Sequence, residues 1–220
     1  MFVDILTLPY LQRPLVLLLI LGIVGGTVGV LVNLRAMEFS VEALVHSVFP
    51  GMVVGLALGG IDGIVPGAAV VAAVAAAALT FVTRRAAAEA GTAVVLTSFY
   101  GVGVVLSLAI GDYSGQLDAL MFGRLLDVTD TRLIQTAVLS TVALVLLASS
   151  AVGVLLVIGY LIIPGAAARL LARTIPMMVG IAVAAGLTAA IIGVVAMNVD
   201  VGHQISPQAA VSLSLVAVFV

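Results

Sequence analysis

The sequence predicts an all-α fold, a polytopic transmembrane helical bundle of about seven or eight spans. Of its 220 residues, 64% are hydrophobic and only 8% are charged, whereas soluble domains carry about 25% charged residues. The apolar runs exceed the roughly 20 residues that cross a hydrocarbon core, and they recur along the whole chain. They are continuous rather than alternating with period two, which favours helices over a β-barrel. We therefore expect one transmembrane domain over residues 1–220, embedded in a lipid bilayer.

Two spans near the N-terminus carry regularly spaced glycines. The first predicted span covers 14–34, and its glycines form two overlapping pairs at four-residue spacing, Gly22 with Gly26 and Gly25 with Gly29. The second span covers 40–60 and repeats this spacing with Gly51, Gly55 and Gly59. Small residues at this spacing let a neighbouring helix backbone approach closely. We expect the row of Gly51, Gly55 and Gly59 to be a site of close helix packing.

The remaining spans follow from the uncharged runs between polar segments. A third span is predicted over 61–82, a fourth over 91–111 and a further one over 177–197. Residues 111–132 form the most polar region and are expected outside the hydrocarbon. The run 133–164 is uncharged throughout, too long for one ordinary span and without a polar break to divide it. The last apolar segment is short, so we expect an incomplete C-terminal span.

One stretch of the second span, MEFSVEALVHSVFPG at 37–51, combines ionisable and apolar residues. Glu42 and His46 are four residues apart, so in a helix both side chains project from one face. A carboxylate oxygen and an imidazole nitrogen suit a divalent transition metal such as Mn²⁺, Zn²⁺ or Fe²⁺. Ionisable groups at membrane depth usually line a bundle interior or a water-filled path. Pro50-Gly51 just downstream favours a helix break, which is common at transporter binding sites.

A plainer interpretation of this pair stays open. Glu42 would then lie near the membrane interface and hydrogen-bond His46, with no metal involved. A second candidate pair is Asp200 and His203, in the polar loop 198–208. That pair could be a further metal contact or a gate, and the alternative is a solvated interfacial loop.

Several chemistries have no support in the sequence. There is no Cys, which excludes disulfides, thiolate metal sites and a cysteine nucleophile. No GxxxxGKS/T phosphate-binding loop occurs, so this chain is not expected to hydrolyse ATP, and neither HExxH nor GxSxG is present. A net charge of −2 without a basic tract gives no indication of nucleic-acid binding. We expect no enzyme activity and no permanently bound cofactor.

Three segments resemble, in the same order, the signatures of the metal-type ABC importer permeases, the membrane subunits of bacterial zinc, manganese and iron uptake systems. The first is MEFSVEALVHSVFPGMVVG (37–55), in which an acidic residue is followed four residues later by His and then by Pro-Gly. Here Glu42 stands where Asp is usual. LMFGRLLDVTDTRL (120–133) resembles the Phe-Gly loop of that family, and VGVLLVIGYLIIPGAAARLLA (152–172) its later apolar signature. The agreement runs through most of 10–218.

The resemblance implies that Glu42 and His46 lie on the ion pathway of a permease that works by alternating access in the bacterial cytoplasmic (inner) membrane. It implies three partners: a cytoplasmic ATPase subunit, an extracytoplasmic metal-binding protein, and a second permease that is identical or paralogous. Family members usually have some tens of residues more before the VGVLL segment, including a part that docks onto the ATPase. Relative to the family, such a segment is missing near 149–150, which means either that the sequence omits residues of the protein or that the chain has lost this coupling part.

Two other function classes remain open. A proton-coupled secondary metal transporter would use Glu42 for coupling, and its uptake would depend on the proton gradient rather than on an ATPase. A structural membrane subunit without a pathway would tolerate replacement of Glu42 and His46. The three signatures favour the permease, and the missing segment favours the alternatives. The metal cannot be chosen from the sequence, because Glu plus His suits Mn²⁺, Zn²⁺ and Fe²⁺ alike.

Overall fold

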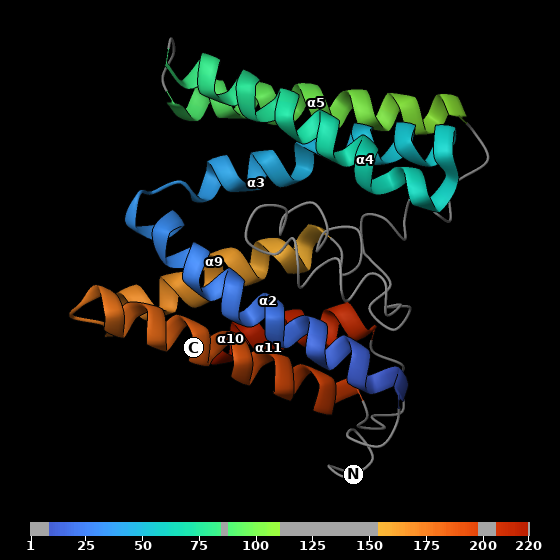
Figure 1. Cartoon of the computed structure of the whole chain (residues 1–220). Helices are drawn as coiled ribbons and strands as arrows, with labels where there is room; N and C mark the ends of the chain where they lie inside the picture. Colours follow the sequence, from blue (N-terminus) through green and yellow to red (C-terminus); the bar gives the residue numbers. More distant parts are fainter. Residues whose placement is uncertain (1–8, 85–87, 111–153, 198–205, 220) are drawn as a thin grey trace.

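The computed structural model describes residues 9–84, 88–110, 154–197 and 206–219. In chain order its helices are α2 (Pro9–Leu34), α3 (Glu38–Ser47), α4 (Phe49–Thr83), α5 (Ala88–Ile110), α9 (Val154–Leu171), α10 (Ile175–Met197) and α11 (Pro207–Phe219) (Figure 1). These ranges contain no strand, which confirms the predicted all-α class. The seam expected at 149–150 and the pair Asp200 and His203 lie outside the described residues.

Several helices are long and apolar enough to cross a membrane. They are Leu11–Leu34, Glu38–Thr83, Glu89–Ile110 and Ile175–Met197, and two shorter apolar helices are Leu156–Leu171 and Pro207–Phe219. The Glu38–Thr83 segment turns back on itself inside α4, so it supplies two arms rather than one long rod. The described part of the chain is therefore a multi-pass helical bundle, as the sequence predicts.

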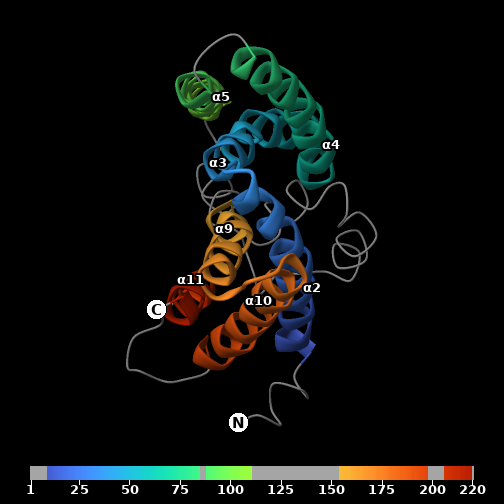
Figure 2. The same ribbon diagram turned by 90° about the vertical axis from the view of Figure 1, so that its left-hand side faces the viewer.

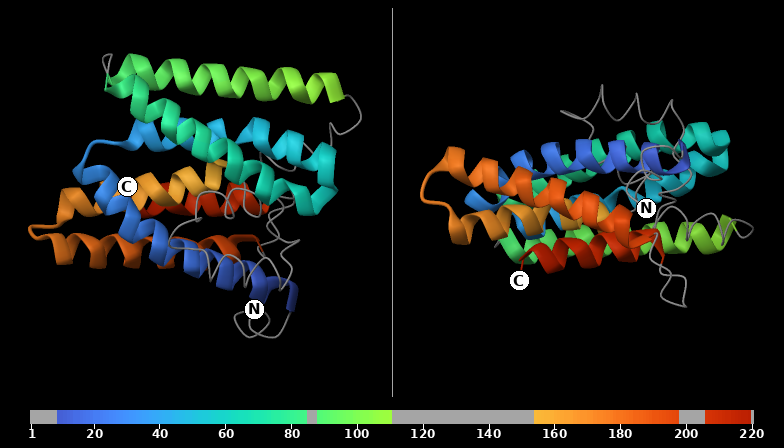
Figure 3. Two further views of the ribbon diagram at one scale, coloured as in Figure 1. Left: turned by 45° about the horizontal axis from the view of Figure 1, so that its top comes forward. Right: turned by 90° about the horizontal axis from the view of Figure 1, so that it is seen from below.

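The helices form two packed groups (Figures 1 and 2). α2, α9, α10 and α11 share one core of fully buried residues such as Leu18, Tyr160 and Leu215. α3 and α4 share a second core around Val45 and Met52, and α5 packs against it. α3 lies between the groups and contacts both α2 and α9. In the views of Figure 3 the helices of both groups run roughly along a common direction, as in a membrane bundle.

One glycine face of α2 packs against α10. A Cβ added at Gly22 would stand 3.0 Å from the carbonyl carbon of Gly186. A Cβ at Gly26 would stand 3.0 Å from the carbonyl carbon of Ala182. Because these neighbours are backbone atoms, any larger residue would push α2 and α10 apart by a few tenths of an ångström, and glycine lets them approach this closely.

The other glycine face of α2 packs against α9. A Cβ at Gly25 would stand 3.0 Å from the carbonyl oxygen of Tyr160, and one at Gly29 would run into that of Leu161. The two overlapping glycine pairs of the first span therefore serve two different neighbours. α2 is therefore packed closely against α10 on one face and against α9 on the other.

α2 ends in a Schellman-type turn whose left-handed residue is not glycine. The Met37 N–H donates to the Val32 carbonyl oxygen at 3.0 Å, and the Ala36 N–H donates to that of Asn33 at 3.3 Å, which is the Schellman pattern. Ala36 has φ 51°, in the left-handed region that glycine usually occupies. This turn carries the chain from α2 into α3.

Polar contacts tie the same end of α2 to α9. The buried Asn33 donates from Nδ2 to the carbonyl oxygens of Gly29 at 3.1 Å and Ile162 at 3.3 Å. Arg169 donates from Nη1 to the Asn33 carbonyl oxygen at 2.9 Å, and a cation at a helix C-terminus is favourable. Since the C-terminal ends of both helices meet here, α2 and α9 run parallel. The 152–172 signature thus contains residues that lock α9 onto α2.

α4 is a hairpin of two helical arms. At the turn, Gly60 has φ 61° and ψ −149°, a region open essentially to glycine alone. Gly51 lies against Gly67 and Gly55 against Gly63, so closely that a Cβ on any of them would run into the opposite carbonyl oxygen. The hairpin therefore depends on two facing glycine pairs and one glycine turn.

The expectation for Gly59 needs correction. Among the described residues, a Cβ at Gly59 would meet no atom within 4 Å, because this residue directly precedes the turn and the arms part there. Of the three glycines expected to pack, the structure places Gly51 and Gly55 against the opposite arm. Their partners Gly63 and Gly67 were not expected.

Candidate metal site

Glu42 and His46 both lie on α3, which begins at Glu38. An acidic residue in the first turn is favourable at the positive end of the helix dipole. α3 buries Ala43 and Val45, whereas Glu42 and His46 are only partly buried. The pair therefore lies at the border between the core and accessible space.

α3 ends at Ser47, one residue after the histidine. Val48 lies between α3 and α4 and keeps right-handed helical backbone angles, φ −72° and ψ −22°, so the interruption is confined to this one turn residue. Pro50 has no N–H, so it cannot donate to the His46 carbonyl oxygen as the fourth residue along a helix normally does. The Val48 N–H donates to that oxygen instead. The interruption thus lies close to Pro50-Gly51, where the sequence favours a break.

The imidazole of His46 is held by its own helix. Its Nδ1 lies 3.0 Å from the backbone carbonyl oxygen of Glu42. A carbonyl oxygen only accepts, so Nδ1 carries the proton and donates, and Nε2 of the neutral ring keeps a free lone pair. Metal-binding histidines typically have this arrangement, with one ring nitrogen donating to a carbonyl or carboxylate and the other binding the ion. Because the partner is the backbone, the Glu42 carboxylate is not engaged by this bond.

Aromatic rings close one side of His46. The Tyr100 ring on α5 has its centroid 6.0 Å from that of His46, with the planes at 77°, an edge-on contact. Phe49 lies against the same tyrosine, with centroids 5.8 Å apart and planes at 33°. α5 comes this close because Gly103 lacks a side chain: a Cβ there would stand 2.5 Å from Phe49 Cδ1 and 3.1 Å from Pro50 Cδ.

Tyr100 is a residue that the sequence did not single out. It lies in the middle of the fourth predicted span, where an aromatic residue has an ordinary packing explanation. Its contact with His46 depends on how α5 meets α3, and a single sequence carries no signal for that contact. The sequence likewise gives no signal that Gly103 contacts Phe49.

Two side chains are too few for a closed metal site. Within the described ranges, no three or more His, Cys, Asp or Glu side chains come together as a metal cluster. Structural zinc sites use four protein ligands and catalytic zinc sites three. A site with two protein ligands completed by water would hold an ion loosely, which suits passage rather than storage.

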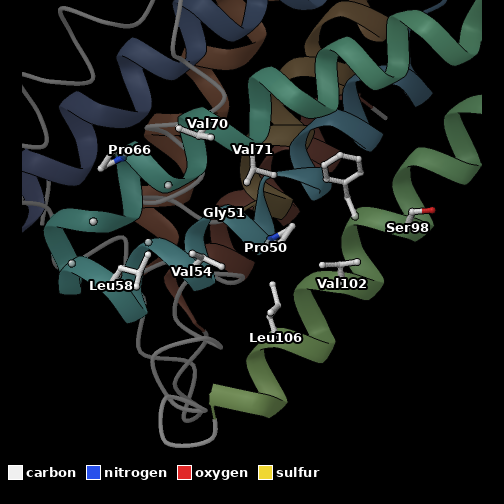
Figure 4. A pocket seen from close by; sticks show the side chains of 15 residues that line it. Pro50, Gly51, Val54, Leu58, Pro66, Val70, Val71, Ser98, Val102 and Leu106 are labelled. Atoms are coloured by element: carbon white, nitrogen blue, oxygen red, sulfur yellow. The ribbon is translucent and has the colours of Figure 1, made fainter.

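An apolar hollow of about 730 Å³ lies between the two arms of α4 and α5 (Figure 4). Pro50 and Gly51 line it next to the break after His46. Figure 4 shows Val102 and Leu106 on α5 facing it from the other side. No ionisable side chain is among its lining residues in the described part of the chain, so no carboxylate or imidazole is supplied to a cation from these walls.

A family model and curated relatives match the chain over most of its length. The model described as the ABC 3 transport family matches residues 7–150 and 145–220. Manganese transport system membrane protein MntC from Halalkalibacterium halodurans is 25% identical over 239 aligned positions, covering 88% of this chain and 80% of that protein. The MntC of Listeria innocua is 28% identical over 227 positions, covering 84% and 80%.

The first of these alignments is longer than the part of the chain it covers. Since 88% of 220 residues is about 194, about 45 of its 239 positions have no counterpart in this chain. The two stretches that match the family model meet at residues 145–150.

A solved structure shares the fold. The chain is similar to PsaBC from Streptococcus pneumoniae in complex with Fab, with a TM-score of 0.78 and 23% identity. The superposition covers 99% of this chain and 92% of that one. At this identity the likeness speaks for the fold alone.

Proposed function

Because the chain belongs to the ABC 3 transport family, we propose that it is the membrane-spanning permease subunit of an ATP-binding-cassette importer for a divalent transition metal. The family membership confirms the resemblance seen in the sequence. Manganese is the first candidate, because relatives that align over most of this chain are named for manganese transport. Zn²⁺ and Fe²⁺ stay as candidates on chemical grounds, since carboxylate and imidazole bind all three.

The observation that carries the ion-pathway proposal is the geometry of His46. Its Nδ1–H donates to the Glu42 carbonyl oxygen, which leaves the Nε2 lone pair for an ion. The Glu42 carboxylate comes from the same turn of α3, so both donors can serve one cation. Both residues are partly exposed, and because an ionisable group that faces lipid is costly, the exposed part fits a water-filled path.

The chain itself would perform no covalent chemistry. A cytoplasmic ATPase subunit would supply the energy, an extracytoplasmic metal-binding protein would deliver the ion, and a second permease copy or a paralogue would complete the pathway. The location would be a bacterial cytoplasmic membrane. Loose binding by two protein donors fits a site that must release its ion at every cycle.

Radiometal uptake tests the proposal directly. Manganese, zinc and iron uptake would be measured in parallel in cells that express the chain with its partner subunits. We expect His46→Ala and Glu42→Gln to abolish uptake of one metal while the protein stays in the membrane. Glu89→Gln is the matched control, because it replaces a carboxylate by an amide as Glu42→Gln does, but at an exposed position in the first turn of α5. Unchanged uptake in both site variants would refute the pathway role.

A second candidate, a proton-coupled secondary transporter, is favoured by one observation. The alignment to MntC of Halalkalibacterium halodurans leaves about 45 positions without a counterpart here, and the family's ATPase-docking part would be among them if they fall at 149–150. Uptake that survives loss of the ATPase and stops with a proton uncoupler would favour this candidate. Uptake that stops without the ATPase favours the importer.

A further inference from the structure

A further inference rests on the proposed function and concerns the tyrosine beside the ion site. We propose that Tyr100 is a positioning residue: its ring holds the imidazole of His46 in the orientation that keeps Nε2 available to the transported ion. Tyr100 acts through His46 and does not bind the ion itself.

Two restraints are needed to fix the imidazole. The hydrogen bond from Nδ1 to the Glu42 carbonyl oxygen fixes one ring atom but still lets the ring tilt about that bond. The edge-on contact with Tyr100, at 6.0 Å and 77°, lies in the range that aromatic pairs prefer. It blocks tilting toward α5. Together the two contacts define both the tautomer and the plane of His46.

Tyr100 can act as a restraint because it is itself fixed. Phe49, a buried core residue at the start of α4, packs against it at 5.8 Å. One turn further along α5, Gly103 lets the helix backbone lie against Phe49 and Pro50. The contact of Tyr100 with Phe49 and the contacts of Gly103 with Phe49 and Pro50 place Tyr100 between the core and His46. A shift of α5 would therefore move the Tyr100 ring and, with it, change the orientation of His46.

Outer contacts of this kind measurably tune metal affinity. Partners that orient a ligating histidine typically contribute about 10- to 100-fold in metal affinity. A ring contact is weaker than the hydrogen bonds on which that range rests, so we expect the lower end, roughly 10-fold. The phenylalanine variant keeps the ring and should stay within about 2-fold of wild type.

The test is a double-mutant cycle on Mn²⁺ binding by the purified full chain in lipid nanodiscs. Free Mn²⁺ is read from its electron paramagnetic resonance signal, which disappears on binding. The variants are Tyr100→Leu, Tyr100→Phe and His46→Ala, with Tyr100→Leu also made in the His46→Ala background. Tyr100→Met is a second ringless variant of flexible shape, should the leucine variant fail to fold.

We expect Tyr100→Leu to weaken binding roughly 10-fold in the wild-type background and to have no further effect in the His46→Ala background. Equal losses in both backgrounds would show general packing damage and overturn the inference. So would wild-type affinity in Tyr100→Leu when His46→Ala binds poorly, although the proposed function would then stand. Wild-type affinity in both His46→Ala and Glu42→Gln would overturn the proposed function and this inference together.

Discussion

Replacing Gly55 by alanine tests how tightly the two arms of α4 are held. The added Cβ would run into the carbonyl oxygen of Gly63 and stand 2.8 Å from its carbonyl carbon, whereas ordinary contact begins at 3.4 Å. Both neighbours are backbone atoms, so no side-chain rotation can relieve the clash. The arms must part by roughly 1 Å, and a gap of that size forfeits about a quarter to a half of the attraction between facing atoms.

The expected loss follows from two opposing effects. Overpacking a close contact usually costs about 1–3 kcal/mol. Against this, alanine stabilises a helix by about 0.5–1 kcal/mol relative to glycine. The difference of these two ranges runs from about 0 to 2.5 kcal/mol, and we expect Gly55→Ala to lower the free energy of unfolding by about 1 kcal/mol. Gly55→Leu, with a much larger side chain, should separate the arms and impair assembly and transport.

Gly59→Ala is the matched control one turn along the same arm. A Cβ at Gly59 meets nothing within 4 Å in the described part of the chain, so the helix preference decides and stability should rise by about 0.5–1 kcal/mol. The assay is unfolding of the purified chain in mixed micelles of rising denaturing detergent, followed by circular dichroism. If Gly55→Ala is as stable as Gly59→Ala, the arms are not held by this glycine contact and the reasoning is wrong.

Three further substitutions can be measured in the same unfolding assay. Gly60→Ala should destabilise by about 1–3 kcal/mol, although no described residue lies within 4 Å of the added Cβ, because φ 61° with ψ −149° is strained for alanine. Wild-type stability would mean that the turn takes another conformation. Ala36→Gly should stabilise by about 0.5–1 kcal/mol by relieving a left-handed alanine at φ 51°, and a loss would argue against the Schellman turn. Tyr160→Phe should stabilise by about 1 kcal/mol, because its buried hydroxyl has no hydrogen-bond partner within the described part of the chain; a loss would show that the hydroxyl is satisfied.

Much of the helix layout could be predicted from the sequence, because charges and glycines mark the span ends. The predicted boundary between the second and third spans, 60 to 61, coincides with the turn at Gly60. The span expected over 177–197 corresponds to α10 (Ile175–Met197). Four-residue glycine spacing indicated close packing but could not say with which helix. That depends on the rotation of each helix in the bundle, which a single sequence does not carry.

In the candidate site, too, local features could be predicted from the sequence and contacts between helices could not. Glu42 and His46 are four residues apart on one helix, and local spacing is sufficient to pair them. The tautomer of His46 could not be predicted, because it depends on which atom Nδ1 meets. Tyr100 was missed because it lies on a different helix and reaches His46 only through the close approach at Gly103.

The two-sided packing of α2 has a mechanical consequence. A screw motion of this helix by one residue, about 1.5 Å along its axis, would bring Ile23 into the place of Gly22 and Thr27 into that of Gly26. Those places have no room for side chains of that size, since a Cβ alone would already stand 3.0 Å from the backbone of α10. The close contacts on both faces therefore oppose sliding of α2, so we expect α2, α9 and α10 to move as one rigid body. Within the described ranges, the covalent link between them and the α3–α5 group runs through Ala36, which is where a change of shape between the two groups would bend this part of the chain.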